Sequence, residues 1–198
     1  VNQLGGIQSG LPEFMITTHH IGDARDAKDY VARVSKFGTA FDQVLEGLER
    51  REEMGIVPPK FVIEHVLRQM RDFIAVPATE QVLYKHFAEE TADVEDLTEG
   101  GRDELLTRLE SRIQGTVYPA YERLIEYFER LESVATTEDG VWKLPDGFKF
   151  YDWTLAHHTT TVNAMLANME MRPARICRSA RPMPKATDTP APGTMFAT

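Results

Sequence analysis

The chain has 198 residues, of which 42% are hydrophobic, and a formal net charge of -9. This composition is ordinary for a globular protein with one hydrophobic core, and the acidic balance argues against nucleic acid as the main partner, because phosphate backbones bind clustered Lys and Arg. The single cysteine, Cys177, excludes an internal disulfide framework and a multi-cysteine metal site. No apolar run is long enough to span a membrane, and no signal peptide is recognisable.

The N-terminal part predicts a loop followed by helices. Residues 1–10 are glycine-rich and are predicted to be a loop, and a short helix is expected from about residue 11 to residue 18. Residues 23–54 are predicted to form one long amphipathic helix, because apolar residues recur there at steps of three and four. Asp23 can cap the start of that helix.

A helix stop and a helix start lie close together after this segment. Gly55 suits a position after a helix C-terminus where φ is positive, and Pro59 suits the beginning of a helix over residues 61–74. The two helices on either side of this turn are expected to form an antiparallel pair on which the rest of the chain packs.

A third long helical pattern follows. Residues 82–87 can form a short helix, and an acidic segment at residues 89–96 precedes a helical pattern over residues 102–134. Pro119 lies inside this pattern, where it removes one backbone hydrogen bond and clashes with the preceding turn. A kink or break is therefore expected near residues 115–118.

The C-terminal part changes in character. A short extended segment is predicted at Val141 to Leu144 and a further helix at residues 148–158, so the fold class is all-α, with long amphipathic helices packed antiparallel. Residues 162–198 contain five Lys/Arg and two Asp/Glu, whereas residues 1–161 contain 17 and 29. This basic, proline-rich tail is predicted to be disordered or aberrant, because its apolar surface is too small to offset the entropy of ordering it.

Histidines and carboxylates are the side chains of this chain that could form a metal or acid–base site. His19–His20 and His157–His158 are adjacent pairs, whose side chains are expected to diverge on a helix or strand. No histidine is followed by glutamate, so the zinc motif H-E-x-x-H is absent, and no catalytic residue, metal ligand or cofactor is predicted in this chain. A metal site shared by the two histidine pairs is a weaker alternative. The acidic residues 89–96 are interpreted as a solvated face.

The best candidate for a functional surface lies between residues 142 and 161, where aromatic, imidazole and hydroxyl side chains follow one another. The candidate substrate-binding residues are Trp142, Tyr151, His157, His158, Thr159, Thr160 and Thr161. A purely structural explanation is at least as strong, because aromatic side chains at helical spacing usually belong to a core and threonine commonly caps a helix.

Six stretches carry a family resemblance. They are VNQLGG (1–6), LPEFM (11–15), GLERREEMGIVPP (47–59), VYPAY (117–121), GVWKLPDG (140–147) and HTTT (158–161). Taken together, in this order and spacing, they resemble the bacterial domain-of-unknown-function family 885 over residues 1–161.

The resemblance implies a mostly helical fold related to zinc metallopeptidases of the gluzincin type, which are hydrolases acting on peptides. It also implies proteins that are often secreted or lipid-anchored, with an H-E-x-x-H-like zinc site C-terminal to the segment matched here. Since the sequence begins at Val1 without methionine, the chain is interpreted as an interior fragment. Such a fragment would not be catalytic by itself and would contribute one wall of a peptide-binding cleft.

The resemblance ends where Val162 begins the basic tail. A reading-frame shift, a truncated gene or a misassembled sequence would each produce this change. The alternative function is a stand-alone helical interaction module whose basic tail binds an acidic partner, an interaction that salt would weaken.

Overall fold

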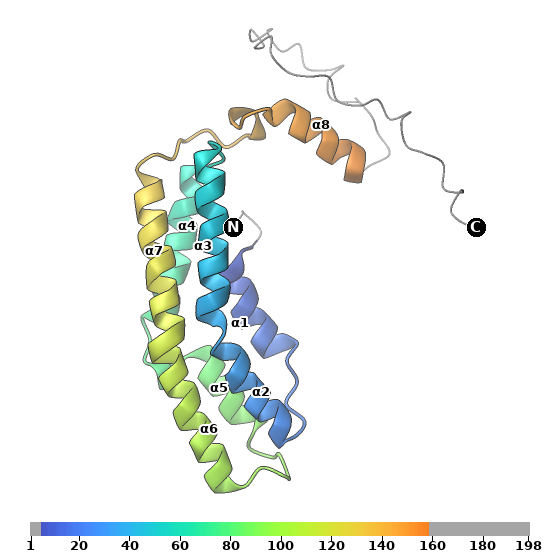
Figure 1. The fold of residues 1–198 in the computed structure, drawn as a ribbon, viewed down its shortest axis with the longest axis vertical. Coiled ribbons are helices and arrows are strands. Elements are labelled where there is room, and N and C mark those ends of the chain that lie inside the picture. Colours follow the sequence, from blue (N-terminus) through green and yellow to red (C-terminus); the bar gives the residue numbers. More distant parts are fainter. Residues whose placement is uncertain (1–4, 159–198) are drawn as a thin grey trace, which may run out of the picture. The chain divides into compact units, whose positions relative to one another are not determined.

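The computed structural model describes residues 5–158 (Figure 1), and these residues form helices and connecting turns without any strand. The prediction of an all-α fold is confirmed. The chain divides into two compact units, Val1–Trp153 and Thr154–Thr198. The basic tail at residues 162–198, which was predicted to be disordered, lies outside the described residues.

Eight α-helices and three single-turn elements make up the described part of the chain. The α-helices are α1 (Ile7–Thr17), α2 (Ala24–Val34), α3 (Phe37–Glu53), α4 (Lys60–Ile74), α5 (Val82–Glu90), α6 (Glu99–Arg112), α7 (Tyr118–Glu132) and α8 (Gly147–His158). The single-turn elements are the 3-10 helices η1 (Ala78–Glu80) and η3 (Val141–Lys143) and the π-helix η2 (Ile113–Val117). None of these helices is both long and apolar enough to cross a membrane, as judged over the described residues.

Helix α1 begins at Ile7, earlier than predicted, and contains Pro12 in its interior. In an α-helix the carbonyl of Gln8 would accept from the N–H of residue 12, which proline lacks. The hydroxyl of Tyr121, on α7, donates to the Gln8 carbonyl instead. A hydroxyl donor from a distant helix therefore replaces the backbone N–H that the proline lacks. The glycine-rich sequence did not indicate this hydrogen bond.

The predicted single helix over residues 23–54 is two helices, α2 and α3, separated at Ser35 and Lys36. The Ser35 hydroxyl donates to the carbonyl of Ala32 at 2.6 Å, and the Lys36 N–H bonds the carbonyl of Arg33 in a tight 3-10 pattern. Such local bonds compete with the helical ladder, which explains the break. Asp23 caps α2 as predicted, accepting from two backbone N–H groups at 2.8 Å.

The turn between α3 and α4 follows the sequence closely. Gly55 has φ of 73°, and Pro59 is the capping residue immediately before α4. Helices α3 and α4 make little direct contact with each other, so the prediction that they pack directly as a pair is wrong, and both pack on α7 instead (Figure 1). The other half of the bundle is formed by α1, α2, α5 and α6, where α6 packs on α2 and α5.

The break predicted before Pro119 is confirmed and takes the form of a π-turn. The N–H of Tyr118 bonds the carbonyl of Ile113, five residues earlier. This wider turn accommodates the proline, which lacks an N–H and whose ring would collide with the preceding turn of an α-helix. Gly38 of α3 lies against this turn, because a Cβ placed on it would be only 3.3 Å from a methyl group of Thr116.

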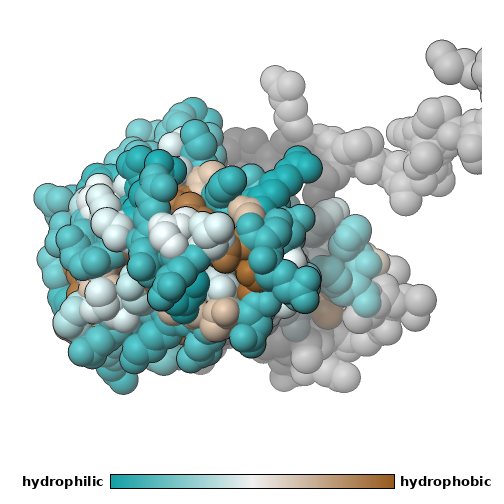
Figure 2. All heavy atoms as spheres, turned by 90° about the horizontal axis from the view of Figure 1, so that it is seen from below, coloured by the Kyte–Doolittle hydropathy of each residue, from teal (hydrophilic) through white to brown (hydrophobic). Residues whose placement is uncertain are grey.

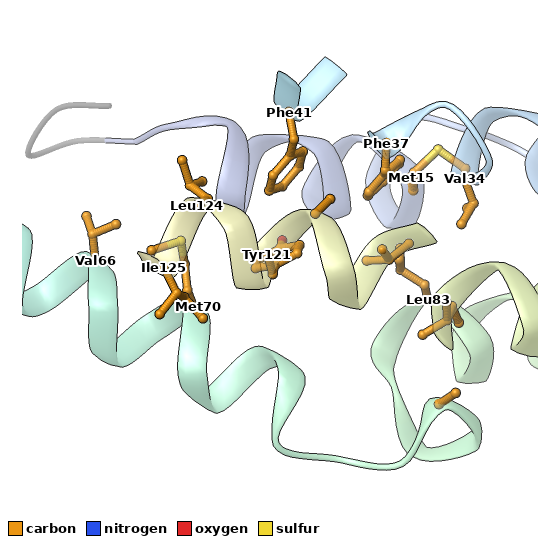
Figure 3. Packing of buried hydrophobic residues seen from close by; sticks show 14 of the residues in the cluster. Met15, Val34, Phe37, Phe41, Val66, Met70, Leu83, Tyr121, Leu124 and Ile125 are labelled. Atoms are coloured by element: carbon orange, nitrogen blue, oxygen red, sulfur yellow. The ribbon is translucent and has the colours of Figure 1, made fainter. Parts of the chain in front are cut away.

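The core is centred on Tyr121 of α7 (Figure 3), whose side chain is completely buried. Its ring lies 4.8 Å from that of Phe41 in α3 and 4.4 Å from that of Phe73 in α4, measured between centroids. Burial raises the pKa of the Tyr121 hydroxyl, which stays neutral and donates to Gln8. One side chain thus joins helices α1, α3, α4 and α7.

The prediction of an extended segment at Val141 to Leu144 is wrong for Val141–Lys143, which form the 3-10 turn η3. The turn forms because Lys143 N–H bonds the carbonyl of Gly140 at 3.3 Å and Leu144 N–H bonds that of Val141 at 3.0 Å. Only the two flanking residues, Gly140 and Leu144, have extended backbone.

Candidate functional site

Trp142 lies in η3, and 60% of its surface is exposed. Its ring folds back over Gly140, since a Cβ on this glycine would be 1.9 Å from the indole. Gly147 is under a similar constraint, because its Cβ would be 1.9 Å from the carbonyl oxygen of Val141. The two glycines therefore permit the compact turn that presents Trp142.

Tyr151 lies in α8 within an aromatic segment. Its side chain is 37% exposed, and Phe150 and Trp153 are 55% and 54% exposed. The rings of Phe150 and Trp153 stack at 6.4 Å between centroids. Trp142 and Tyr151 are thus surface aromatic residues, which is the property that the substrate-binding prediction requires. The structural explanation, in which these aromatics belong to the core, does not hold for them.

The aromatic residues of α7 do belong to the core. Tyr121 is completely buried, and Tyr127 is 6% exposed. Tyr118 is half-buried, and its hydroxyl donates to the carbonyl of Val76 at 2.6 Å. The helical spacing of these tyrosines therefore indicated packing.

His157 and His158 end α8 in the second unit of the chain. Their ring centroids are 5.0 Å apart in an edge-to-face arrangement. The expectation that neighbouring side chains diverge is therefore wrong for this pair. Thr159, Thr160 and Thr161, the other candidate residues, lie outside the described residues.

His19 has a structural role. It is 7% exposed, its Nδ1 lies 2.6 Å from Nη1 of Arg33, and its Nε2 lies 3.2 Å from the carbonyl oxygen of Asp26. Because arginine can only donate, Nδ1 accepts, and Nε2 must carry the proton that is donated to Asp26. Both ring nitrogens are occupied, and the ring packs edge-on against Tyr30. No group of three His, Cys, Asp or Glu in residues 5–158 is placed to hold a metal ion.

The strongest electrostatic cluster joins Glu52 at the end of α3 to Arg130 and Tyr127 of α7. The guanidinium of Arg130 donates to both carboxylate oxygens of Glu52, at 2.7 and 2.9 Å, and its carbon lies 5.1 Å from the centre of the Tyr127 ring. The hydrogen bond from Arg130 lowers the pKa of Glu52. Burial, together with the negative charge of Glu52, raises the pKa of Tyr127 to about 12. At neutral pH the carboxylate of Glu52 therefore stays ionised and the phenol of Tyr127 stays neutral. These states suit an ion pair that holds the two helices together and not acid–base chemistry.

The carboxylates of the acidic segment at residues 89–96 are exposed, as its interpretation as a solvated face requires, whereas Thr91 within it is buried. It borders a surface hollow together with His20 and Asp23. Asp96 has one structural function, because its carboxylate accepts from the N–H of Ala24 at 2.9 Å, at the start of α2.

Exposed apolar side chains gather at one end of the bundle, where the connection between α3 and α4 meets the segment after α7. We call this surface the apolar end, and its members are Met54, Ile56, Phe61 and Val134. Two contacts bring the segments together: Lys60 N–H donates to the carbonyl of Thr136 at 2.9 Å, and a Cβ on Gly55 would lie 3.6 Å from Pro145. Figure 2 shows the bundle from the opposite end, which is mainly hydrophilic.

Comparisons with known proteins identify a family and a fold. Residues 1–167 match the family model described as "Bacterial protein of unknown function (DUF885)", six residues beyond the segment in which the resemblance was noted. A solved structure, described as "the putative lipoprotein from Colwellia psychrerythraea", is similar with a TM-score of 0.81 and 23% identity. The similarity covers 84% of this chain and 28% of the Colwellia chain, so the fold described here corresponds to a minor part of a longer protein. No curated protein matches the chain.

Proposed function

The chain belongs to the bacterial DUF885 family, and we propose that it forms a non-catalytic helical part of a zinc metallopeptidase-like hydrolase, lining one wall of a peptide-binding cleft. The relation to gluzincin peptidases comes from the sequence resemblance. The length comparison supports the idea of a part, because a similar fold accounts for only 28% of the Colwellia chain. In this proposal the zinc and its ligands belong to polypeptide outside the described residues.

The single observation that carries the proposal is the exposure of the aromatic side chains between residues 142 and 153. Trp142, Tyr151 and Trp153 are each between 37% and 60% exposed, although they are among the largest apolar groups in the chain. Aromatic side chains of this kind supply contact area at little cost in conformational entropy and are enriched where proteins bind peptides and other proteins. We propose Trp142 and Tyr151 as contacts to substrate.

The other candidate residues follow from the sequence alone. His157, His158 and the threonines at positions 159–161 continue the same segment of chain and supply groups that can donate hydrogen bonds to the carbonyls of a peptide. They belong to the proposal as polar contacts. No residue of the chain is proposed as a nucleophile, a general base or a metal ligand.

Peptide binding by the purified chain tests this proposal. Fluorescein-labelled casein peptides should bind, and Trp142→Ser should weaken their binding by about tenfold, which corresponds to roughly 1.4 kcal/mol for an exposed aromatic contact. Phe14→Ser is the matched control, because Phe14 is also exposed, at 40%, but lies in α1. Equal weakening by both substitutions, or no measurable binding by the parent chain, would refute the cleft-wall assignment.

A second function is favoured by the charge distribution. Residues 1–161 carry 17 Lys/Arg and 29 Asp/Glu, whereas residues 162–198 carry five and two. We propose residues 1–161 and 162–198 as the two functional segments of the chain, and the basic segment would bind an acidic protein in the interaction-module alternative. Binding to an acidic probe such as heparin that falls with salt, and is lost when residues 162–198 are deleted, would favour this alternative.

A further inference from the structure

We propose that the apolar end is a docking surface for another part of the polypeptide in a full-length family protein, a part that presents apolar side chains bordered by lysine or arginine. The inference rests on the proposed function, since it names what the helical part packs against. It concerns the end of the bundle formed by the α3–α4 connection and the segment after α7. The proposed peptide-binding aromatics of α8 are not needed for it.

The first argument is the concentration of exposed apolar residues. Between residue 5 and the start of α8, eight large apolar side chains are exposed, and four of them belong to the apolar end. Phe61 is 48% exposed, Met54 57% and Val134 61%. Of the other four, Trp142 is the proposed substrate contact, and Phe14, Val76 and Val82 lie apart on different elements, as is normal for scattered apolar residues on protein surfaces. A set gathered at one end is typical of an interface.

The charged side chains near the apolar end also favour such a partner. Arg130 and Lys60, two cations near the apolar end, are already in ion pairs with Glu52 and Glu132. The exposed carboxylates of Glu53, Glu138 and Asp139 form no hydrogen bond or salt bridge in the described part of the chain, although the charge of Lys143 acts on Glu138 and Asp139. A partner with lysine or arginine at its border would pair with these acids.

The same charges argue against a second copy of this chain. A symmetric dimer places the same patch on both sides of the interface, so each border carboxylate would face others of like charge. Juxtaposed like charges are unfavourable at an interface, and Arg130 and Lys60 near this end are already paired with Glu52 and Glu132. The occupant that fits is a different polypeptide surface.

The third argument identifies the source of that surface. The Colwellia protein has the same fold over 28% of its chain, and the remaining polypeptide must pack somewhere on or beside that fold. The opposite end of the bundle is mainly hydrophilic (Figure 2), and the sides carry ion pairs such as Arg123–Asp42 and Arg71–Glu129. Burial of the apolar end by additional polypeptide would therefore gain free energy.

Superposition on the Colwellia structure provides the first test. The positions equivalent to Met54, Phe61 and Val134 should be covered by residues of the Colwellia chain outside the matched region, with Lys or Arg near the equivalents of Glu53 and Glu138. Equivalent positions that are open to solvent would overturn the proposal.

The second test uses the full 198-residue chain and a synthetic, fluorescein-labelled peptide of the Colwellia segment that the superposition places over Phe61. Fluorescence polarisation should show binding that Phe61→Ser weakens by about tenfold and that added salt also weakens. Val82→Ser is the matched control, because Val82 is 42% exposed on α5, away from the apolar end. Equal affinities for the two variants, or absence of binding, would overturn the proposal.

Sedimentation velocity tests the alternative that a second copy of this chain covers the apolar end. The full chain should be monomeric at concentrations that saturate the peptide, and a dimer that Phe61→Ser dissociates would assign the apolar end to self-association instead. Failure of the proposed function has a separate signature, because cleavage of peptides by this chain, or absence of casein-peptide binding, would leave the docking measurements with Phe61→Ser unchanged.

Discussion

The hydroxyl of Tyr121 offers the sharpest test of how the bundle is held together. Tyr121→Phe keeps the ring against Phe41 and Phe73 but removes the donor to the carbonyl of Gln8, a residue that is only 4% exposed. Because Pro12 has no N–H, the carbonyl cannot recover its helical partner, and a buried acceptor left unpaired costs about 1–3 kcal/mol. We expect the free energy of unfolding to fall by this amount.

Urea unfolding followed by circular dichroism at 222 nm measures the effect. With a denaturant slope of about 2 kcal/mol per molar, the midpoint of Tyr121→Phe should fall by roughly 0.5–1.5 M. Tyr84→Phe is the control, because Tyr84 is half-buried and its hydroxyl makes no hydrogen bond in the described part of the chain. Its midpoint should change by less than about 0.3 M, since it removes no buried bond.

A double-mutant cycle isolates the compensation for proline. Pro12→Ala restores an N–H that can donate to the Gln8 carbonyl, so Tyr121→Phe should cost less in this background than in the parent, by about 1 kcal/mol. The reasoning is refuted if Tyr121→Phe leaves the midpoint of the parent chain unchanged, or if its cost is the same with proline and with alanine at position 12.

Three further outcomes follow from the structure. Gly147→Ala should increase proteolytic cleavage of the adjoining turn, because the new Cβ would collide with the carbonyl of Val141. By contrast, a Cβ at Gly47 would have no atom within 4 Å, so Gly47→Ala should raise the urea midpoint by up to about 0.5 M. Arg130→Met should lower stability by about 0.2–1 kcal/mol at pH 7, the value of an exposed ion pair. The pKa of Glu52 is lowered in the folded chain, so the stability that this carboxylate contributes is present above its usual pKa near 4.5 and is lost as the pH falls through the lowered value. Parent and Glu52→Gln midpoints measured from pH 7 down to pH 2 should therefore converge at the acidic end, and a constant difference would contradict this assignment.

Local sequence signals predicted those helix boundaries that depend on the residues immediately beside them in the chain. Gly55 has the positive φ that a helix end requires, Pro59 stands immediately before α4, and Asp23 caps α2. Pro119 marked the irregular turn in the long helix correctly, although the π form of that turn depends on Tyr118 bonding to Ile113.

Boundaries set by tertiary contacts escaped prediction. Helix α1 extends back to Ile7 through Pro12 because a hydroxyl from α7 supplies the missing donor. The break at Ser35 arises from a competing side-chain bond, which many serines inside helices do not make. The apolar pattern that crosses this break is nearly continuous, so periodicity alone could not reveal it.

The candidate site was predictable only in part. The sequence singled out Trp142 and Tyr151 as aromatic residues but could not show whether their side chains are buried or exposed. In the structure both side chains lie at the surface. The tie between Glu52 and Arg130 was missed, because the two residues are 78 positions apart and only the packing of α3 on α7 joins them. The apolar end was missed for the same reason, since its members come from two separate segments.

The central claim is that this chain lacks the catalytic zinc of the hydrolase it is proposed to belong to. The most direct measurement is the zinc content of the purified 198-residue chain after dialysis against zinc, combined with mass spectrometry of casein peptides incubated with it. We predict that zinc is far below one ion per chain and that the peptides stay intact. Stoichiometric zinc together with cleavage, both abolished by His157→Ala and His158→Ala, would contradict the account and place the catalytic site within this chain.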